Sequence, residues 1–171
     1  MNEHRRMPFL TGGCQCGAVR YALYARPHNV HICHCRMCQK AVGGPFAALA
    51  PVKRADFAWT RGAPAEFASS SLARRPYCRD CGTPLGFRYL DSETCSVTIG
   101  SLDRPENARP ETQYGVESRI DWLDQVNALP RKVMEAEMPA ARKAKRASYQ
   151  HPDHDTPVDW RPTSPARRGE T

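Results

Sequence analysis

The 171-residue chain predicts a mainly β fold followed by a C-terminal extension. Short apolar segments with β-branched and aromatic residues alternate with Gly- and Pro-containing turns, as in proteins built of short strands. No stretch before residue 120 has a convincing helical period, and the composition changes after Pro130. We therefore expect a β domain over residues 10–128 and a basic, proline-rich extension over residues 129–171.

Ala18–Tyr24 is the clearest predicted strand. Val19, Tyr21 and Leu23 alternate along it with Arg20 among the residues opposite, which predicts a strand with one buried face. Glycine and proline residues at 43–45, 61–64 and 82–84 mark turns between the later segments. The other predicted strands are Phe46–Pro51, Phe57–Trp59, Leu85–Tyr89 and Thr94–Ile99, and Asn29–Cys33 is a short apolar approach to a cysteine cluster.

The extension divides into two parts. Arg131–Tyr149 is rich in Ala, Lys, Arg, Glu and Met, which predicts a helix interrupted at Pro139. Residues 150–171 contain four prolines and many charges, with Val158 and Trp160 as apolar anchors, which is typical of an extended arm.

Two absences guide the prediction of the compartment. No apolar run approaches the roughly 20 residues that cross a bilayer, and the N-terminal residues lack the apolar segment of a signal peptide. We therefore expect a cytoplasmic protein with reduced thiols and no membrane partner. Whether the chain forms a homo-oligomer is left open by the sequence.

Seven of the eight cysteines fall into tight clusters, which favours metal binding over disulfides. A disulfide within C-x-C would be badly strained, and no export signal is present. A tetrahedral zinc ion takes four ligands, so two pairs complete one site while a triple leaves one position free. The clusters are Cys14-Gln-Cys16, Cys33-His-Cys35-Arg-Met-Cys38 and Cys78-Arg-Asp-Cys81, and Cys95, outside them, is expected to pack in the core.

The two pairs predict a structural zinc site. Gly82 after Cys81 permits the positive φ that a C-x-x-C turn often needs, and glycines also flank the first pair. Roughly 60 residues separate the pairs, so one ion would clamp the first hairpin to a late one and stabilise the fold.

The cysteine triple predicts a second zinc ion with three protein ligands, which is typical of catalytic sites. Its fourth ligand could be water, a substrate thiol, or His31 or His34, although His34 between two ligands is expected to point away. Arg36 and Lys40 would offset the negative charge and attract a carboxylate-bearing ligand. The alternative is a second structural site with an unrecognised fourth ligand.

The formal charge of +7 counts every cysteine as neutral. Seven thiolates outweigh two zinc ions by three charges, which lowers the total to +4. Residues 131–171 hold nine Lys or Arg and six Asp or Glu, so most of the remaining excess lies in the extension. Basicity alone therefore does not indicate a nucleic-acid partner.

The cysteine clusters and their flanking residues resemble the glutathione-dependent formaldehyde-activating enzyme family, also called the centromere-protein-V-like domain. The resemblance covers about residues 10–125 and matches all seven cysteines in order. Members often carry a histidine before Val-Glu-Ser-Arg, whereas Gln113–Arg119 here lacks one. The matching segments are Gly12–Tyr21, Cys33–Lys40 with Gly44–Phe46, and Tyr77–Leu85.

The resemblance implies a compact β fold of the Mss4-like (β-tent) type with antiparallel sheets. It implies one zinc on Cys14, Cys16, Cys78 and Cys81 and a second on Cys33, Cys35 and Cys38. It also implies carbon–sulfur lyase activity, with the S-hydroxymethyl adduct of glutathione as the family's named substrate.

The leading hypothesis is a zinc-dependent carbon–sulfur lyase that acts on a glutathione or other thiol adduct of a small aldehyde. Cys33, Cys35 and Cys38 would hold the catalytic zinc, and the predicted substrate contacts are Arg36, Gln39, Lys40 and Phe46. The alternatives are a zinc-stabilised module that binds protein or nucleic acid without catalysis, and a thiol or metal sensor.

Overall fold

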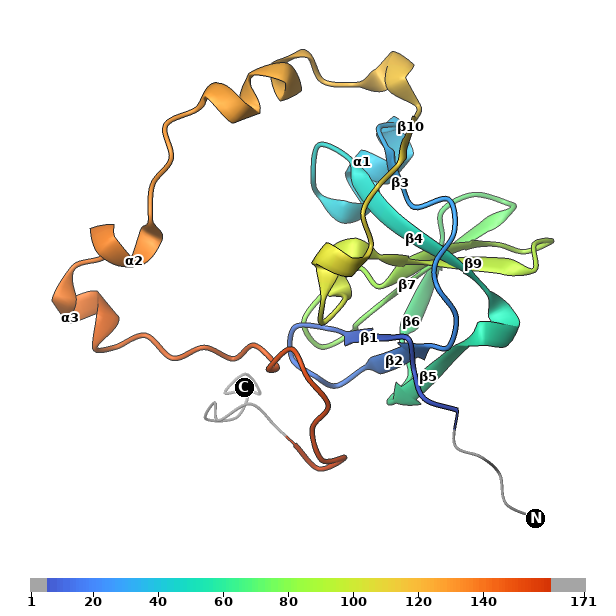
Figure 1. The fold of residues 1–171 in the computed structure, drawn as a ribbon, viewed down its shortest axis with the longest axis horizontal. Helices are drawn as coiled ribbons and strands as arrows, with labels where there is room; N and C mark the ends of the chain where they lie inside the picture. Colours follow the sequence, from blue (N-terminus) through green and yellow to red (C-terminus); the bar gives the residue numbers. More distant parts are fainter. Residues whose placement is uncertain (1–5, 161–171) are drawn as a thin grey trace, which may run out of the picture.

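The computed structural model describes residues 6–160, which form two β-sheets and an extension that leaves the body and returns to it (Figure 1). One sheet has the strand order β1-β2-β5 and the other the order β10-β3-β4-β9-β8-β7-β6. The predicted mainly β class is confirmed. The strands are β1 (Leu10–Gly13), β2 (Arg20–Leu23), β3 (His31–Cys33), β4 (Ala47–Lys53), β5 (Phe57–Arg61), β6 (Ala65–Ala68), β7 (Ala73–Tyr77), β8 (Gly86–Tyr89), β9 (Thr94–Thr98) and β10 (Thr112–Tyr114).

The strand pairs described are antiparallel with one exception, because β10 runs parallel to β3. In this pair Thr112 lies opposite His31 and Tyr114 opposite Cys33. The expectation of antiparallel sheets is confirmed, with this one parallel pair at an edge of the larger sheet. About 80 residues connect the two strands, which is ample chain for a parallel return.

The hydrophobic core lies between the two sheets. Tyr21 and Leu23 from β2 are fully buried, and Val97 from β9 packs in the same cluster. Burying such a side chain contributes about 1.5–3 kcal/mol. Cys14 and Cys78 also belong to this hydrophobic core, so the pair Cys14/Cys16 meets the pair Cys78/Cys81 at the core.

Strand β2 is buried on both faces, so the prediction of a single buried face is wrong. Arg20 is 4% exposed because its guanidinium donates two hydrogen bonds to Asp103, at 2.7 and 2.5 Å. Burial acts to raise the pKa of the Asp103 carboxyl, but hydrogen bonds from Arg20 and Thr11 hold that pKa below its ordinary value. Asp103 therefore neutralises the charge of Arg20 on the face of β2 that the sequence predicts to be exposed.

The structure contains a helix that the sequence did not predict, α1 (Arg36–Val42). It begins after Cys35, whose side chain accepts a hydrogen bond from the Cys38 amide, and ends at Gly43, with φ 64°. Two turns are too short for an apolar period to show. The remaining helices are α2 (Met134–Glu137), α3 (Ala140–Lys143) and the 3₁₀ segments Arg54–Asp56, Ile99–Ser101, Pro105–Asn107, Val116–Ser118 and Asp121–Ala128.

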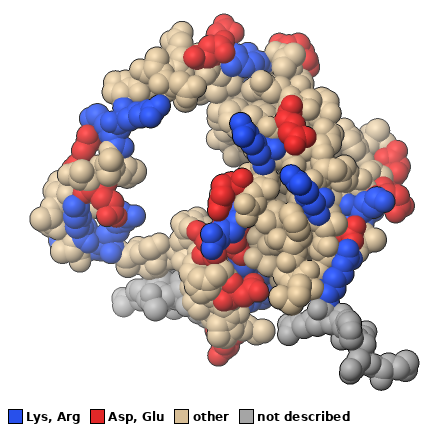
Figure 2. Space-filling view, viewed as in Figure 1, with Lys and Arg blue, Asp and Glu red and all other residues tan. Residues whose placement is uncertain are grey.

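The predicted helix over Arg131–Tyr149 is reduced to two single turns on either side of Pro139. Isolated turns this short gain little without packing, and the residues of α2 and α3 are exposed. Acidic and basic side chains are interspersed along the extension that carries α2 and α3 (Figure 2). Arg146, in the basic stretch, forms an ion pair with Glu135 at 3.3 Å.

The arm returns to the loop that follows β1. The amide of His151 donates to the Gln15 carbonyl at 2.7 Å, and Arg61 donates to the Thr156 carbonyl at 2.7 Å. His151 is buried, and its Nε2 lies 2.8 Å from the Thr156 hydroxyl. Residues 161–171 of the predicted extension lie outside the described residues. No helix among the described residues is long and apolar enough to cross a membrane.

Candidate metal centre

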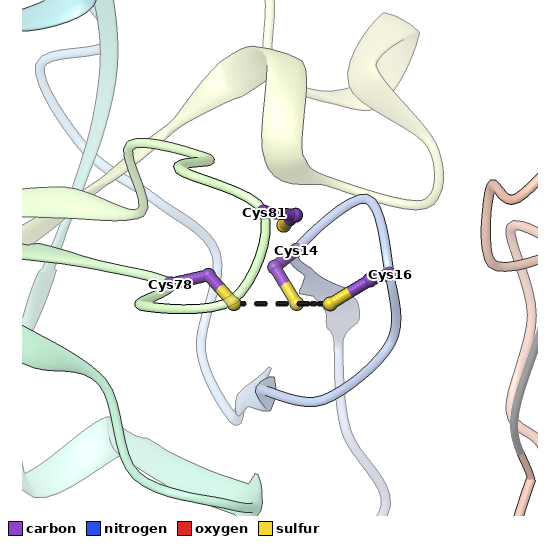
Figure 3. A group of neighbouring side chains, drawn as sticks. All are labelled: Cys14, Cys16, Cys78 and Cys81. Carbon is purple, nitrogen blue, oxygen red and sulfur yellow. Dashed lines mark hydrogen bonds between the residues drawn. The ribbon is translucent and has the colours of Figure 1, made fainter. Parts of the chain in front are cut away.

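Two loops bring four cysteines together at one end of the core (Figure 3). Cys14 and Cys16 follow β1, whereas Cys78 and Cys81 follow β7. Their four sulfurs lie within 4.8 Å of one another, with 3.6 Å from Cys14 to Cys16 and 3.8 Å from Cys16 to Cys78. A tetrahedron with Zn–S bonds of about 2.3 Å has edges of about 3.8 Å. The cluster therefore fits a tetrahedral thiophilic ion.

Local hydrogen bonds hold these thiols in place. The Val19 amide donates to the Cys14 sulfur at 3.2 Å, and Thr83 lies 3.1 Å from the Cys81 sulfur. Burial raises the pKa of Cys16 to about 11, whereas hydrogen bonds, chiefly from Thr83, outweigh burial at Cys81 and lower its pKa to about 6. Since metal ligation needs thiolates, binding an ion here releases protons. Gly82 has φ 76°, as the sequence predicted for this turn.

The second cluster is assembled from the end of β3 and the beginning of α1. The sulfurs of Cys33, Cys35 and Cys38 lie within 4.8 Å of one another. Burial raises the pKa of Cys33 to about 12. At Cys35 burial acts in the same direction, but hydrogen bonds from the Cys38 amide and the neighbouring thiols lower the pKa. Three soft donors this close can bind one thiophilic metal ion.

Among residues 6–160, no fourth His, Cys, Asp or Glu joins the three-cysteine cluster. His34 turns away, as expected: its Nε2 lies 2.8 Å from Gln113 Oε1, and its ring contacts Phe46. His31 Nδ1 lies 2.7 Å from the Asn29 carbonyl. Neither histidine is therefore arranged as a ligand of this cluster.

The three cysteines line a cleft of about 640 Å³. Its walls come from β3, β4, β7, β8, β9 and β10 and include Arg75, Arg88 and Tyr114. None of the lining residues is acidic. Arg88 forms an ion pair with Glu66 at 2.7 Å, so the positive charge that a ligand meets near the sulfurs comes chiefly from Arg75, beside aromatic side chains such as Tyr114.

Comparison with known proteins identifies the family. A sequence model of the glutathione-dependent formaldehyde-activating enzyme family matches residues 9–118, a segment that contains all seven clustered cysteines. The chain belongs to this family. The match also spans every strand of both sheets.

Two relatives of this family member carry enzyme names. An uncharacterized lyase of Schizosaccharomyces pombe is 30% identical over 122 residues, covering 71% of this chain and 88% of the relative. A Halomonas elongata protein, provisionally named a glutathione-dependent formaldehyde-activating enzyme, is 29% identical and covers 67% of this chain and 80% of its own. A crystal structure of a Rhodobacter sphaeroides protein aligns with TM-score 0.47 and 24% identity, covering 61% of this chain and 98% of that one.

The four predicted substrate contacts of this family member lie outside the lining of the cleft. Arg36, Gln39 and Lys40 share one side of α1 and line a separate, shallower depression, because positions three and four apart lie on the same helix face. The Gln39 amide is buried and donates to the His34 carbonyl at 2.7 Å. Phe46 packs against His34. Gln39 and Phe46 therefore support the cysteine loop through their contacts with His34.

Sequence reasoning missed the residues that form the walls of the cleft. Arg75 lies on β7 and donates to the Cys38 sulfur at 3.2 Å, while Phe87 on β8 packs beneath the guanidinium at 4.8 Å. Tyr114 on β10 meets the His31 ring edge-on at 4.9 Å. Spacing along the chain gives no signal for these residues, because strand order brings them to the cysteines.

Gly115 provides a test of how tightly the second cluster is held. Its φ is 66°, and an added Cβ would lie 2.7 Å from the Cys35 amide nitrogen and 3.1 Å from the Cys35 Cβ. Gly115→Ala is expected to displace Cys35 and lower the metal affinity of this cluster, with about 1–2 kcal/mol of backbone strain. Gly43→Ala is the matched control, because Gly43 has φ 64° but nothing within 4 Å of an added Cβ. Metal content and thermal unfolding of both variants check this; equal metal content would contradict it.

Proposed function

We propose that this family member is a zinc-dependent carbon–sulfur lyase that acts on the thiol adduct of a small aldehyde, with S-hydroxymethyl glutathione as the proposed substrate. The observation that carries the proposal is a set of three sulfurs, without a fourth described protein ligand, lining the 640 Å³ cleft. The family and the names of the two relatives support the same reaction class.

The proposed ions are zinc at both clusters. Cysteine thiolates select soft or borderline ions, and tetrahedral four-sulfur sites are typical of zinc in its structural role. Zinc bound to Cys33, Cys35 and Cys38 would supply a Lewis acid that stabilises negative charge on a substrate sulfur.

The proposed reaction breaks the C–S bond of an adduct RS–CH₂–OH. The bonding electron pair goes to sulfur, the hydroxyl oxygen forms the aldehyde C=O bond, and the hydroxyl proton leaves. The products are a thiol and formaldehyde, so the atoms balance without a redox step. In the reverse direction the same site would form the adduct. The protein must therefore stabilise sulfur and accept one proton.

His31 is the proposed proton acceptor. It lies two residues before Cys33 on β3, so both side chains project from the same face of the strand, about 6.6 Å apart along it. The Asn29 carbonyl can only accept a hydrogen bond, so Nδ1 of His31 carries the proton of the neutral ring. Nε2 is then the acceptor, on a residue that lines the cleft.

The charges of the cleft favour an anionic thiol. Arg75 and Arg88 are among its lining residues, while Asp and Glu are absent from the lining. Arg88 already forms a two-point ion pair with Glu66, at 3.0 and 2.7 Å. The positive charge near the sulfurs therefore comes chiefly from Arg75, which favours an adduct that brings an anionic sulfur to this end of the cleft.

The direct experiment measures the exchange between formaldehyde and its glutathione adduct by ¹³C exchange NMR. The zinc-loaded chain is expected to accelerate this exchange by at least about tenfold over the uncatalysed reaction. Mild chelation is expected to remove one of two zinc ions and the acceleration together, and added zinc should restore both. The ion at the four-cysteine cluster should stay bound under these conditions.

Absence of acceleration with two zinc ions bound would overturn the proposal. If the chain instead bound DNA or a protein in a salt-sensitive manner that deletion of residues 131–171 removed, the binding-module alternative would be favoured. Two equally inert ions would point to a second structural site.

A further inference from the structure

Arg75 is a buried cation whose partners are unusual. It is 4% exposed, and its guanidinium donates from Nη2 to the Cys38 sulfur at 3.2 Å and from Nε to the Ser69 hydroxyl at 2.9 Å. The ring of Phe87 covers it at 4.8 Å. None of the ion pairs found in residues 6–160 includes Arg75.

Comparison with Arg20 shows that Arg75 lacks a carboxylate partner among the described residues. Arg20 and Arg75 are the buried arginines among the described residues, each 4% exposed. Arg20 has a carboxylate partner, Asp103, in two-point contact. A buried charge without a counter-charge costs several kcal/mol, so Arg75 needs a negative group nearby. The group that it contacts is the three-cysteine cluster.

With a divalent metal ion bound, the three-cysteine cluster would supply the negative charge that Arg75 needs. Three thiolates and one divalent ion leave a single negative charge, which one guanidinium neutralises. Arg75 also lines the same cleft as Cys33, Cys35 and Cys38. An anionic sulfur that approached the loaded cluster without Arg75 would meet net negative charge in a partly buried site, where repulsion is strong.

We propose that Arg75 is the counter-ion of the three-cysteine metal centre and a positioning residue for the reaction there. It holds the Cys38 sulfur by a charge-assisted hydrogen bond, and it lets the centre accept an anionic sulfur. The kinetic part of this inference rests on the proposed function. The metal-binding part does not.

The test compares Arg75→Met and Arg75→Lys with Arg74→Met in the full-length chain. Arg74 is the matched control, because it is the neighbouring residue on β7 and, within residues 6–160, its side chain donates to the carbonyls of Ser70 and Ala73 and not to a cysteine. Competition with a chelator measures zinc affinity at each cluster, and loading with Co²⁺ gives the sulfur-to-metal charge-transfer band. The ion at the three-cysteine cluster is identified as the one lost in Cys35→Ser.

Arg75→Met is expected to weaken zinc binding at the three-cysteine cluster by about ten- to hundredfold, as for other partners of metal ligands. It should also shift the Co²⁺ charge-transfer band and raise KM for the thiol adduct. Arg75→Lys should recover part of each loss, and Arg74→Met should change none. The four-cysteine cluster should keep its affinity in all three variants.

The inference fails if Arg75→Met leaves affinity and band position as in Arg74→Met. If Arg75→Met does not fold, Arg75→Gln, which keeps a polar side chain but removes the charge, takes its place, and unchanged affinity and band position in that variant overturn the inference equally. If the wild-type chain shows no lyase activity but Arg75→Met still loses zinc affinity, the counter-ion role stands and the proposed function is wrong. Normal zinc affinity with a raised KM would place Arg75 in substrate binding alone.

Discussion

Cys81→Ser is expected to unfold the protein. Cys81 belongs to the cluster that joins the loop after β1 to the loop after β7, and Cys16 and Cys78, which meet in it, are 62 residues apart. A cross-link that closes so long a loop stabilises by about 4 kcal/mol in the chain-entropy relation. Domains of this size are stable by about 5–15 kcal/mol. The loss therefore removes a large part of the total.

Burial links the four-cysteine cluster to the core. Cys14 and Cys78 lie in the hydrophobic core, 3% and 1% exposed, so loss of the ion releases two loops that pack against the core. Thermal unfolding followed by circular dichroism, together with limited proteolysis and metal content, measures the outcome. Cys95→Ser is the control, because Cys95 also contacts the core but belongs to neither cluster. A folded Cys81→Ser chain that keeps two ions would contradict the structural role.

The grouping of the cysteines could be predicted because metal coordination is a local chemical constraint. Short spacings such as Cys78-x-x-Cys81 place two sulfurs on one turn whatever the rest of the fold does. The positive φ at Gly82 followed from the same turn. Several strands were predicted for a similar reason, since β-branched and aromatic runs between turns carry their own signal.

The burial of Arg20 could not be predicted, because it depends on a residue far along the chain. Alternation along the segment predicts one buried face with Arg20 on the other, whereas all four residues of β2 are buried. Its partner Asp103 is 83 residues away, and only the fold brings the two together. An isolated arginine in a strand otherwise reads as exposed.

The lining of the cleft could not be predicted either, because it too is formed by residues that are far apart in the sequence. Arg75 reaches Cys38 from 37 residues away because of the order of strands in the seven-stranded sheet. Helix α1, in contrast, directs residues that are near the cysteines in sequence away from the cleft. Arg36 and Lys40 are close to the cysteines in sequence, but the helix turns them to another face.

Cys35→Ser is expected to abolish turnover and leave the fold intact. The three ligands of its cluster fall within residues 33–38, so an ion there closes almost no loop and contributes little to the stability of the whole domain. Cys35 is also the N-cap of α1, where its sulfur accepts the Cys38 amide at 3.4 Å. Serine is a favourable N-cap, so the helix keeps its first hydrogen bond.

The chemical loss should be large, because the variant removes a thiolate ligand from the centre that stabilises the substrate sulfur. A metal ion contributes several kcal/mol to such a step, so the exchange rate should fall to that of the uncatalysed reaction. Stability should change by only about 1 kcal/mol. Exchange NMR and thermal unfolding on the same preparation separate the two effects. Unfolding as complete as in Cys81→Ser would make this cluster structural, whereas turnover at the wild-type rate would remove it from the reaction.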